Sequence, residues 1–191
     1  MGQENAKDHT QRLFIAIPVP EPISKKLENW TLVHKERLSF RKWTHPRDYH
    51  ITLQFLGDTT AAQRDALQAA LRDVKAKPLT LVLNGAGTFG PAKSPRVLWA
   101  AIAGHLEGLN NLHVEVIKAT RTVGFVPEDR PYSPHITLAR GFAGGTEMSN
   151  ESTASAPSSL EWKADRFVLM RTHMHAAPMY EIIGEYPLAE H

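Results

Sequence analysis

The tetrapeptide His-Ile-Thr-Leu occurs twice in this chain, at residues 50–53 and again 85 positions later at residues 135–138. Each copy is rich in β-branched residues and alternates polar with apolar side chains, which predicts a β-strand. In such a strand the histidine and threonine point to one face, and the isoleucine and leucine point to the other. The fold must therefore bury two apolar strand faces and leave two His-x-Thr pairs on faces that polar groups can occupy.

The remaining sequence predicts strands and helices in irregular order. Apolar β-rich runs predict strands at 12–20, 79–83, 97–102, 165–172 and 179–188, and 3.6-residue periodicity predicts helices from Pro22 onward, at 59–74 and from Leu106 to near Gly124. Thr59 or Thr60 is a suitable cap for the second helix. Because βαβ units do not alternate strictly, we expect an α+β fold rather than a doubly wound parallel sheet.

The two halves of the chain resemble each other, since each contains a helix and a His-x-Thr strand. We therefore expect a single bilobal domain over residues 1–191, with two pseudo-symmetric lobes of antiparallel sheet backed by helices. The two His-x-Thr strands should line a central cleft. Three polar or Gly/Pro-rich stretches should lie outside regular structure: a flexible tail at 1–11, a loop at 85–95 and a mobile loop at 144–159.

Composition restricts the classes of protein that this chain can represent. The formal net charge of +2 is too small to indicate a nucleic-acid binder by itself. The absence of cysteine excludes disulfides, thiolate metal sites and thiol nucleophiles. The polar N-terminus has no signal-peptide pattern, and no apolar run is long enough to cross a bilayer. We expect a soluble, cytoplasmic, monomeric protein that does not bind membranes.

Two residues of extended strand separate each histidine from its threonine by roughly 6.6–6.8 Å, a gap that accommodates a small anion. Imidazoles titrate near neutral pH, so one of a pair can donate a proton while the other accepts one. Phosphodiester hydrolysis needs both groups, and threonine hydroxyls can donate to the non-bridging oxygens. This chemistry requires no metal and no cofactor. A single His-x-Thr pair is an ordinary feature of a half-solvated strand; it is the second copy that favours a catalytic site.

The paired motifs, together with the strings "RLFIAI", "HITLQFLG", "RVLWAAI" and "PHITLAR", resemble the two-histidine (2H) phosphoesterase superfamily. They are most similar to its RNA 2′,3′-cyclic phosphodiesterase branch, also called 2′-5′ RNA ligase or LigT-like proteins. The resemblance runs from about Arg12 to Leu188. It implies hydrolysis of RNA 2′,3′-cyclic phosphate ends, such as those of tRNA fragments, to 2′-phosphomonoesters, with 2′-5′ ligation as the reverse reaction.

The resemblance also implies roles for individual residues. His50 corresponds to the proton donor toward the leaving ribose oxygen, and His135 to the proton acceptor from water. These two labels could exchange with the direction of the reaction, because the motifs are nearly symmetric. Thr52 and Thr137 match the threonines that contact the phosphate, and Arg140 matches a contact to the substrate phosphate or to RNA.

Strict alternation would place Arg140 on the face opposite His135, so we expect a bulge, turn or strand end to redirect it; otherwise it is a solvated arginine. Phe14 and Phe55 are candidates for stacking on a nucleobase, although aromatic residues in apolar runs more often belong to the core. Alternation places Gln54 on the His50 face, where it would line the cleft wall.

Several alternatives stay open at this stage. His173 and His175 could form a metal pair, but no cysteine or nearby acidic residue supports it. The phosphodiesterase chemistry could act on a small cyclic nucleotide, an ADP-ribose cyclic phosphate or a 2′-5′ oligonucleotide instead of an RNA end. The chain could also be a non-catalytic RNA-binding module, although both histidines and both threonines are intact.

Overall fold

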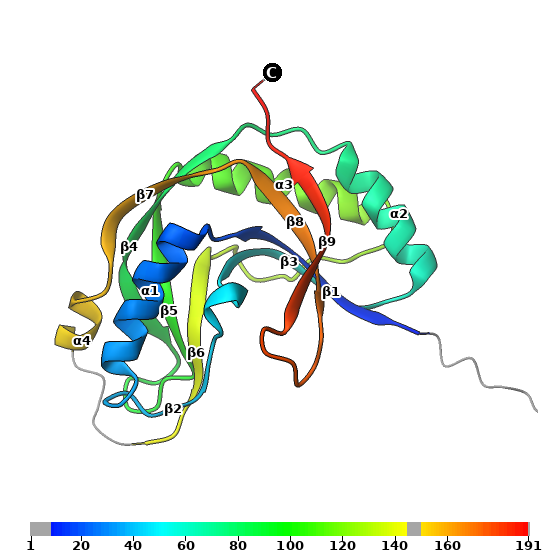
Figure 1. Ribbon diagram of the computed structural model, residues 1–191. Coiled ribbons are helices and arrows are strands. Elements are labelled where there is room, and N and C mark those ends of the chain that lie inside the picture. Colours follow the sequence, from blue (N-terminus) through cyan, green and yellow to red (C-terminus); the bar gives the residue numbers. More distant parts are fainter. Residues whose placement is uncertain (1–8, 145–149, 191) are drawn as a thin grey trace, which may run out of the picture.

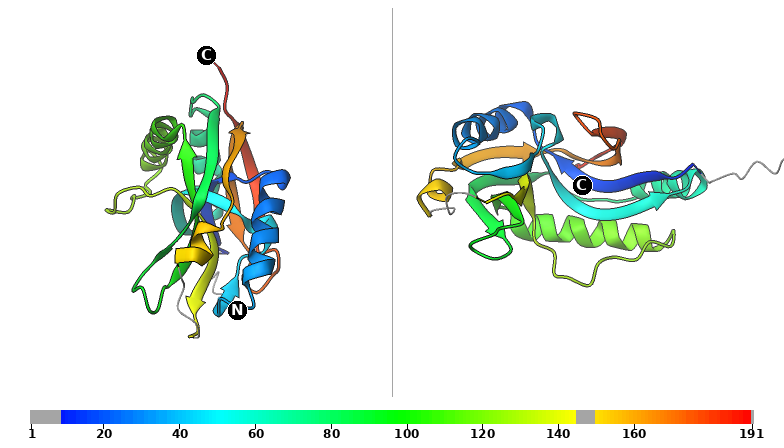
Figure 2. Two further views of the ribbon diagram at one scale, coloured as in Figure 1. Left: turned by 90° about the vertical axis from the view of Figure 1, so that its left-hand side faces the viewer. Right: turned by 90° about the horizontal axis from the view of Figure 1, so that it is seen from below.

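The computed structural model describes residues 9–144 and 150–190. Within these ranges nine strands form one antiparallel sheet in the order β7-β4-β5-β6-β3-β1-β8-β9, with β2 also paired to β6 (Figure 1). The strands are β1 (Gln11–Pro18), β2 (Phe40–Trp43), β3 (His50–Thr59), β4 (Leu79–Phe89), β5 (Val97–Gly104), β6 (His135–Phe142), β7 (Ser158–Ala164), β8 (Arg166–Thr172) and β9 (Tyr180–Pro187). The sheet is strongly curled, as the two side views in Figure 2 show.

Helices cover the strands from two sides. Helix α1 (Glu21–His34) lies on one side, while α2 (Ala61–Arg72) and α3 (Leu106–Arg121) lie together on the opposite side (Figure 2). Two short elements complete the described part of the chain, the 3-10 turn η1 (Pro46–Asp48) and α4 (Asn150–Ala154). No helix in the described ranges is long and apolar enough to span a membrane.

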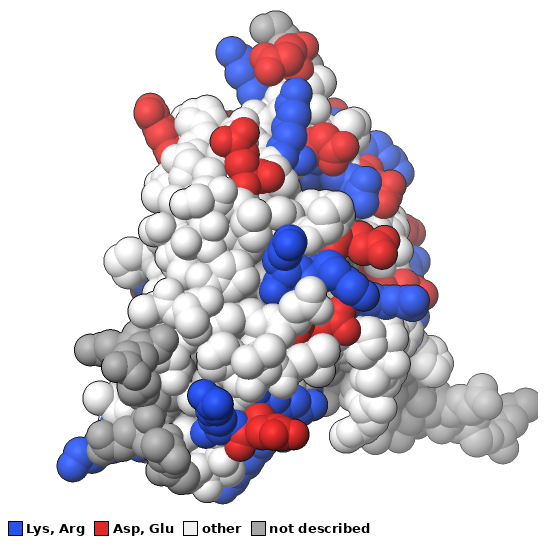
Figure 3. Space-filling model, turned by 60° about the vertical axis from the view of Figure 1, so that its left-hand side comes forward, with Lys and Arg blue, Asp and Glu red and all other residues white. Residues whose placement is uncertain are grey.

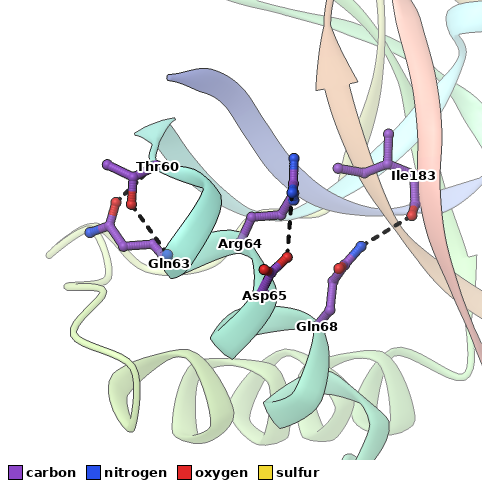
Figure 4. Close-up of polar contacts among 6 residues, drawn as sticks. All are labelled: Thr60, Gln63, Arg64, Asp65, Gln68 and Ile183. Atoms are coloured by element: carbon purple, nitrogen blue, oxygen red, sulfur yellow. Dashed lines mark hydrogen bonds and ion pairs between the residues drawn. The ribbon is translucent and has the colours of Figure 1, made fainter. Parts of the chain in front are cut away.

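The start of α2 shows how sequence sets a helix boundary. Thr60 accepts a hydrogen bond from the Gln63 backbone N–H through its hydroxyl oxygen, and the Gln63 side chain accepts one from the Thr60 N–H (Figure 4). This reciprocal capping box satisfies two N–H groups that the first turn leaves without helical partners. One turn further on, Gln68 donates to the Ile183 carbonyl oxygen at 3.2 Å, which ties α2 to β9.

Strand β1 is buried on both faces, which explains its continuous apolar sequence. Leu13, Ile15 and Ile17 point into the main core, which extends over most of the described chain. Phe14 and Ala16 point the other way and pack with β8 side chains in a second, smaller cluster. The second cluster lies on the face that carries the His50 side chain, because Ala16 is directly opposite Thr52 in the β1–β3 pairing.

The predicted α+β class and pseudo-symmetry are confirmed. The order β3-β1-β8-β9 on one side of the sheet is matched by β6-β5-β4-β7 on the other. The two groups of strands are joined into one continuous sheet, because the two motif strands β3 and β6 pair directly with each other at its centre. The His-x-Thr strands are thus neighbours within the sheet.

The tail expected at 1–11 and the loop expected at 144–159 fall partly outside the described residues, which omit 1–8 and 145–149. In the described parts, β1 already begins at Gln11, and residues 150–154 and 158–159 belong to α4 and β7. The prediction of an irregular loop was wrong there. Ser158 pairs with Asn84 of β4, and Trp30 Nε1 donates to Ser155 Oγ at 3.1 Å. Backbone pairing and polar contacts hold this segment, and neither requires the apolar bulk that the sequence lacks.

The loop expected from residue 85 is also partly wrong, because β4 continues to Phe89 and stays paired with β5. The register shifts between Leu83 and Ala86, where Gly85 adopts a positive φ of 84°. Glycine tolerates this conformation without steric cost, so the strand passes through a bulge and continues.

Candidate active site

The four motif side chains share one face of the sheet. Ile51 of β3 lies directly opposite Ile136 of β6, and both are fully buried in the main core. Residues that flank a directly opposed pair point to the other face, so both His-x-Thr pairs are on the face away from the main core. The antiparallel register also brings each histidine toward the threonine of the other motif.

The His50 imidazole is fixed in one tautomer. Its Nδ1 lies 2.7 Å from the Asp48 carbonyl oxygen, which can only accept, so Nδ1 carries the proton. The Nε2 atom of neutral His50 is then an acceptor, and the Thr52 hydroxyl donates to it at 3.0 Å. Burial lowers the pKa of His50 to about 4, and this effect outweighs the opposing contribution of the carbonyl bond and the Asp48 charge.

The His135 imidazole has the same tautomer by the same means. Its Nδ1 donates to the Ser133 carbonyl oxygen at 2.8 Å, two residues before the histidine as in the first motif. Burial lowers the pKa of His135 as well, and the Arg140 charge adds to this effect. In the described part of the chain no hydrogen bond joins His135 to Thr137. Both histidines therefore have an unprotonated Nε2 atom, but only the Nε2 atom of His50 already has a hydroxyl partner.

Aromatic rings pack around both imidazoles. Phe14 and Tyr180 lie with ring centres 4.8 and 5.3 Å from that of His50, and Phe89 lies 5.0 Å from that of His135. Trp99 flanks His135 at 6.4 Å and lies across Gly87, where an added Cβ would come within 2.5 Å of the indole. These rings account for the desolvation that lowers both imidazole pKa values.

A bulge at the end of the second motif redirects Arg140, as we expected if this residue contacts the substrate. The β5–β6 register shifts between Leu98 and Trp99, so that Leu138 and Ala139 are both buried and Arg140 is exposed. This change of phase returns Arg140 to the face of His135. The Arg140 charge contributes to the pKa values of His50, His135 and Tyr180, so its guanidinium lies on their side of the sheet.

The first motif has an equivalent bulge, and this corrects the expectation for Gln54. The β1–β3 register shifts between Ile15 and Ala16, so Leu53 and Gln54 are both buried. Gln54 therefore points away from the His50 face and accepts a hydrogen bond from the Thr120 hydroxyl of α3 at 2.7 Å. Phe55, at the position equivalent to Arg140, is directed to the His50 face instead.

The two candidate stacking residues differ in exposure. Phe14 is 3% exposed and belongs to the apolar cluster beneath His50, whereas Phe55 is 55% exposed. Both line a pocket of about 290 Å³ next to His50, together with Arg12, Leu13, Gly57, Thr172, Met174, Met179 and Tyr180. Phe55 thus offers an accessible ring, and Phe14 mainly packs against the imidazole.

Sequence reasoning missed Asp48 as part of the site. This carboxylate is 3% exposed and accepts hydrogen bonds from the Met179 and Tyr180 backbone N–H groups at 2.9 and 3.2 Å. It thereby fixes the start of β9 beside His50, while its own carbonyl holds Nδ1 of the imidazole. Residues 131 and 132 positions apart meet here, and no local pattern signals such a contact.

The metal pair considered for His173 and His175 is not completed by a third ligand among the described residues. His173 Nε2 lies 3.5 Å from a Glu181 carboxylate oxygen. Among the described residues no group of three or more His, Asp or Glu side chains is arranged to hold a metal ion.

The curled antiparallel sheet and the paired imidazoles are those expected of a two-histidine phosphoesterase, and comparison with known proteins gives the family. The sequence matches the family described as LigT like Phosphoesterase over residues 17–99 and 103–180. The chain belongs to this family. It is 37% identical over 178 residues to an RNA 2′,3′-cyclic phosphodiesterase of Geobacillus stearothermophilus, covering 92% of this chain but only 56% of that protein.

Two further comparisons cover nearly the full length of both partners. An RNA 2′,3′-cyclic phosphodiesterase of Bacillus subtilis is 33% identical over 183 residues, which is 92% of this chain and 96% of that protein. The crystal structure of E. coli LigT complexed with 3′-AMP superposes with a TM-score of 0.79, covering 95% of this chain and all of that one, at 24% identity. At that identity the superposition shows a shared fold.

Proposed function

We propose that this protein hydrolyses RNA 2′,3′-cyclic phosphate ends to 2′-phosphomonoesters by metal-independent acid–base catalysis. One observation carries the proposal: two imidazoles on paired strands each donate Nδ1–H to a backbone carbonyl, and both direct Nε2 to the same face of the sheet. The relatives from Geobacillus and Bacillus are RNA 2′,3′-cyclic phosphodiesterases, which supports the choice of substrate.

In the proposed reaction, water attacks phosphorus while His135 Nε2 accepts a proton from it. The bond between phosphorus and the ribose 3′-oxygen breaks, and the proton on His50 Nε2 passes to that oxygen. The products are a 2′-phosphate and a 3′-hydroxyl, and one proton has been taken up and one released. If the 5′-hydroxyl of a second RNA attacks phosphorus in place of water, the same proton transfers expel the 3′-oxygen and leave a 2′-5′ phosphodiester, so 2′-5′ ligation belongs to the same proposal.

The hydrogen bond between Thr52 and His50 supports a role for this hydroxyl in the proton transfer. In the free protein the hydroxyl donates to Nε2. Once Nε2 carries a proton it no longer accepts, and the hydroxyl hydrogen is free to turn toward a phosphate oxygen. Thr137 would contact the phosphate from the other motif.

Both imidazole pKa values are lowered, so the donor must gain its proton when the substrate binds. Both rings are neutral at pH 7 in the free protein, and a bound phosphate anion favours the charged form of a nearby imidazole. A group with a low intrinsic pKa gives up its proton readily, so His50 becomes an effective acid once the substrate has promoted its protonation. The proposal assigns His135 as the imidazole that stays neutral and serves as the base.

The pocket beside His50 would receive the terminal nucleobase, with Phe55 as its accessible stacking surface. Its volume of about 290 Å³ suits a single base. RNA fragments such as those of tRNA, a monomeric state and a cytoplasmic location complete the proposal.

The test is a short RNA ending in a 2′,3′-cyclic phosphate, incubated with the protein in EDTA and analysed against 2′- and 3′-phosphate standards. Conversion to the 2′-phosphate is the expected result. Formation of the 3′-phosphate would contradict the assigned leaving group, and a requirement for added metal would contradict the paired-imidazole mechanism. Turnover of ADP-ribose cyclic phosphate or a 2′-5′ oligonucleotide, with the RNA inert, would move the same chemistry to another substrate.

A further inference from the structure

Lys42, which the sequence analysis did not single out, lies next to Arg140. The two residues are directly opposite each other in the β2–β6 pairing, which brings their Cα atoms to about 4.5–5.5 Å. Directly opposed residues project to the same face of a sheet. Because the bulge in β6 returns Arg140 to the histidine face, Lys42 must project there too.

The contact made by the Lys42 ammonium confirms this direction. Its Nζ lies 3.7 Å from the sulfur of Met179. Met179 precedes Tyr180, whose ring packs against His50, and it lines the pocket beside that histidine. The ammonium is therefore at the rim of the active site, beside the pocket that Met179 lines.

These two cations have no anionic partner. In the part of the chain that the structure describes, neither Lys42 nor Arg140 forms an ion pair with a carboxylate. Like charges directly opposite in a sheet repel each other, so the arrangement destabilises the free protein unless an anion lies between them. A bound phosphate would remove that repulsion.

The surroundings give no general attraction for nucleic acid that could replace a specific contact. The net charge is only +2, and Figure 3 shows positive and negative side chains interspersed on the face that it displays. Electrostatic binding of RNA phosphates other than the reacting one must then come from a few local cations. Arg140 is near both imidazoles, so in the proposed function it contacts the reacting phosphate, and Lys42 beside it remains available for the next phosphate of the RNA.

We propose that Lys42, beside Arg140, forms a second phosphate subsite that holds the phosphodiester immediately 5′ of the terminal nucleotide. This inference rests on the proposed function and narrows its substrate to RNA chain ends in preference to free nucleoside cyclic phosphates. Lys42 is a specificity-determining residue, and it takes no part in proton transfer.

The test compares Lys42→Gln with the unchanged protein on two substrates, a dinucleotide ending in a 2′,3′-cyclic phosphate and the corresponding mononucleoside cyclic phosphate. We expect kcat/KM to fall about five- to tenfold more on the dinucleotide, the effect of one partly solvated charge-assisted contact. Arg41→Gln removes the same charge from the same strand, but alternation directs Arg41 to the opposite face, so it should not discriminate between the substrates.

A third substrate isolates the charge. In a dinucleotide whose internal linkage is an uncharged methylphosphonate, Lys42→Gln should have no larger effect than on the mononucleoside. Equal losses of kcat/KM on all three substrates, or no loss on any of them, would overturn the inference.

Binding separates this inference from the proposed function. The dinucleotide 2′-phosphate should bind Lys42→Gln about five- to tenfold more weakly than it binds the unchanged protein, measured by calorimetry without turnover. If the unchanged protein hydrolyses no cyclic phosphate, the proposed function fails, and the binding difference still decides the role of Lys42. Equal affinities would overturn the subsite even if hydrolysis proceeds.

Discussion

The two halves of the site use the same backbone device in different surroundings. In each, a carbonyl two residues before the histidine fixes the tautomer, and a bulge after the motif changes which residues face the site. The side chains at equivalent positions differ, with Phe55 in the first half and Arg140 in the second. The comparison shows how one repeated backbone geometry supplies an apolar side and a charged side, which the proposed function assigns to the nucleobase and the phosphate.

The largest expected effect comes from removing either imidazole. His50→Ala and His135→Ala should each lower kcat about 10²–10⁴-fold, because each removes one proton transfer. His105→Ala, at the start of α3, provides a histidine control that should leave kcat unchanged. A variant of His50 or His135 that stays folded by circular dichroism and keeps near-native turnover would show that the halves do not act as an acid–base pair.

The equivalent positions Phe55 and Arg140 should respond differently. Arg140→Gln should lower kcat/KM about 10²-fold, because a cation aimed at the reacting phosphate stabilises the transition state. Phe55→Ala should act mainly on KM, by about 1–3 kcal/mol for loss of base stacking, and Phe55→Tyr should restore it. Similar changes in kcat for both variants would remove the division into a base side and a phosphate side.

The two threonines should give smaller effects that differ in one respect. Thr52→Val and Thr137→Val should each lower kcat/KM about tenfold, the value of one hydrogen bond to a charged group. Only Thr52→Val should also raise the pKa of His50, because its hydroxyl donates to neutral Nε2 and so favours the neutral form. NMR titration of the imidazoles checks this, with Thr52→Ser as the control that keeps the hydroxyl.

The last effect is on stability, and it appears only at acidic pH. The pKa of His50 falls to about 4 on folding, so the unfolded chain binds more protons than the folded one between about pH 6.5 and pH 4. The contribution of His50 to the free energy of unfolding should therefore be complete above this window and decrease as the pH falls through it. Thermal unfolding of the unchanged protein and of His50→Gln over this range measures the difference. Identical pH dependence in both would show that His50 is not desolvated.

Much of this architecture was predictable because it depends on local periodicity. The motif strands, the cap at Thr60 and the faces of Ile51 and Ile136 all follow from two- and 3.6-residue patterns. The bulge that redirects Arg140 could be required from the sequence only because a functional role was assumed for that residue.

The features that the sequence did not reveal depend on tertiary packing. Gln54 was placed on the wrong face because a bulge at Leu53–Gln54 leaves no local sign, and the Thr120 hydroxyl that receives Gln54 is 66 residues away. Asp48 was missed for the same reason, since its partners are in β9. The start of β7 was not predicted, because its pairing with β4 uses backbone hydrogen bonds that require no particular pattern of apolar side chains.

The interleaved strand order has a consequence for how the chain folds. Strands β4 to β7 come from one uninterrupted stretch, residues 79–164, whereas β1 pairs with the nearby β3 but takes its other neighbour, β8, from the far end of the chain. Closing that long loop costs more conformational entropy than pairing β4 with β5, which follow each other directly. We therefore expect the half around His135 to acquire amide protection before the half around His50 in pulsed hydrogen-exchange refolding. The two imidazoles would then come together only in the last stage of folding.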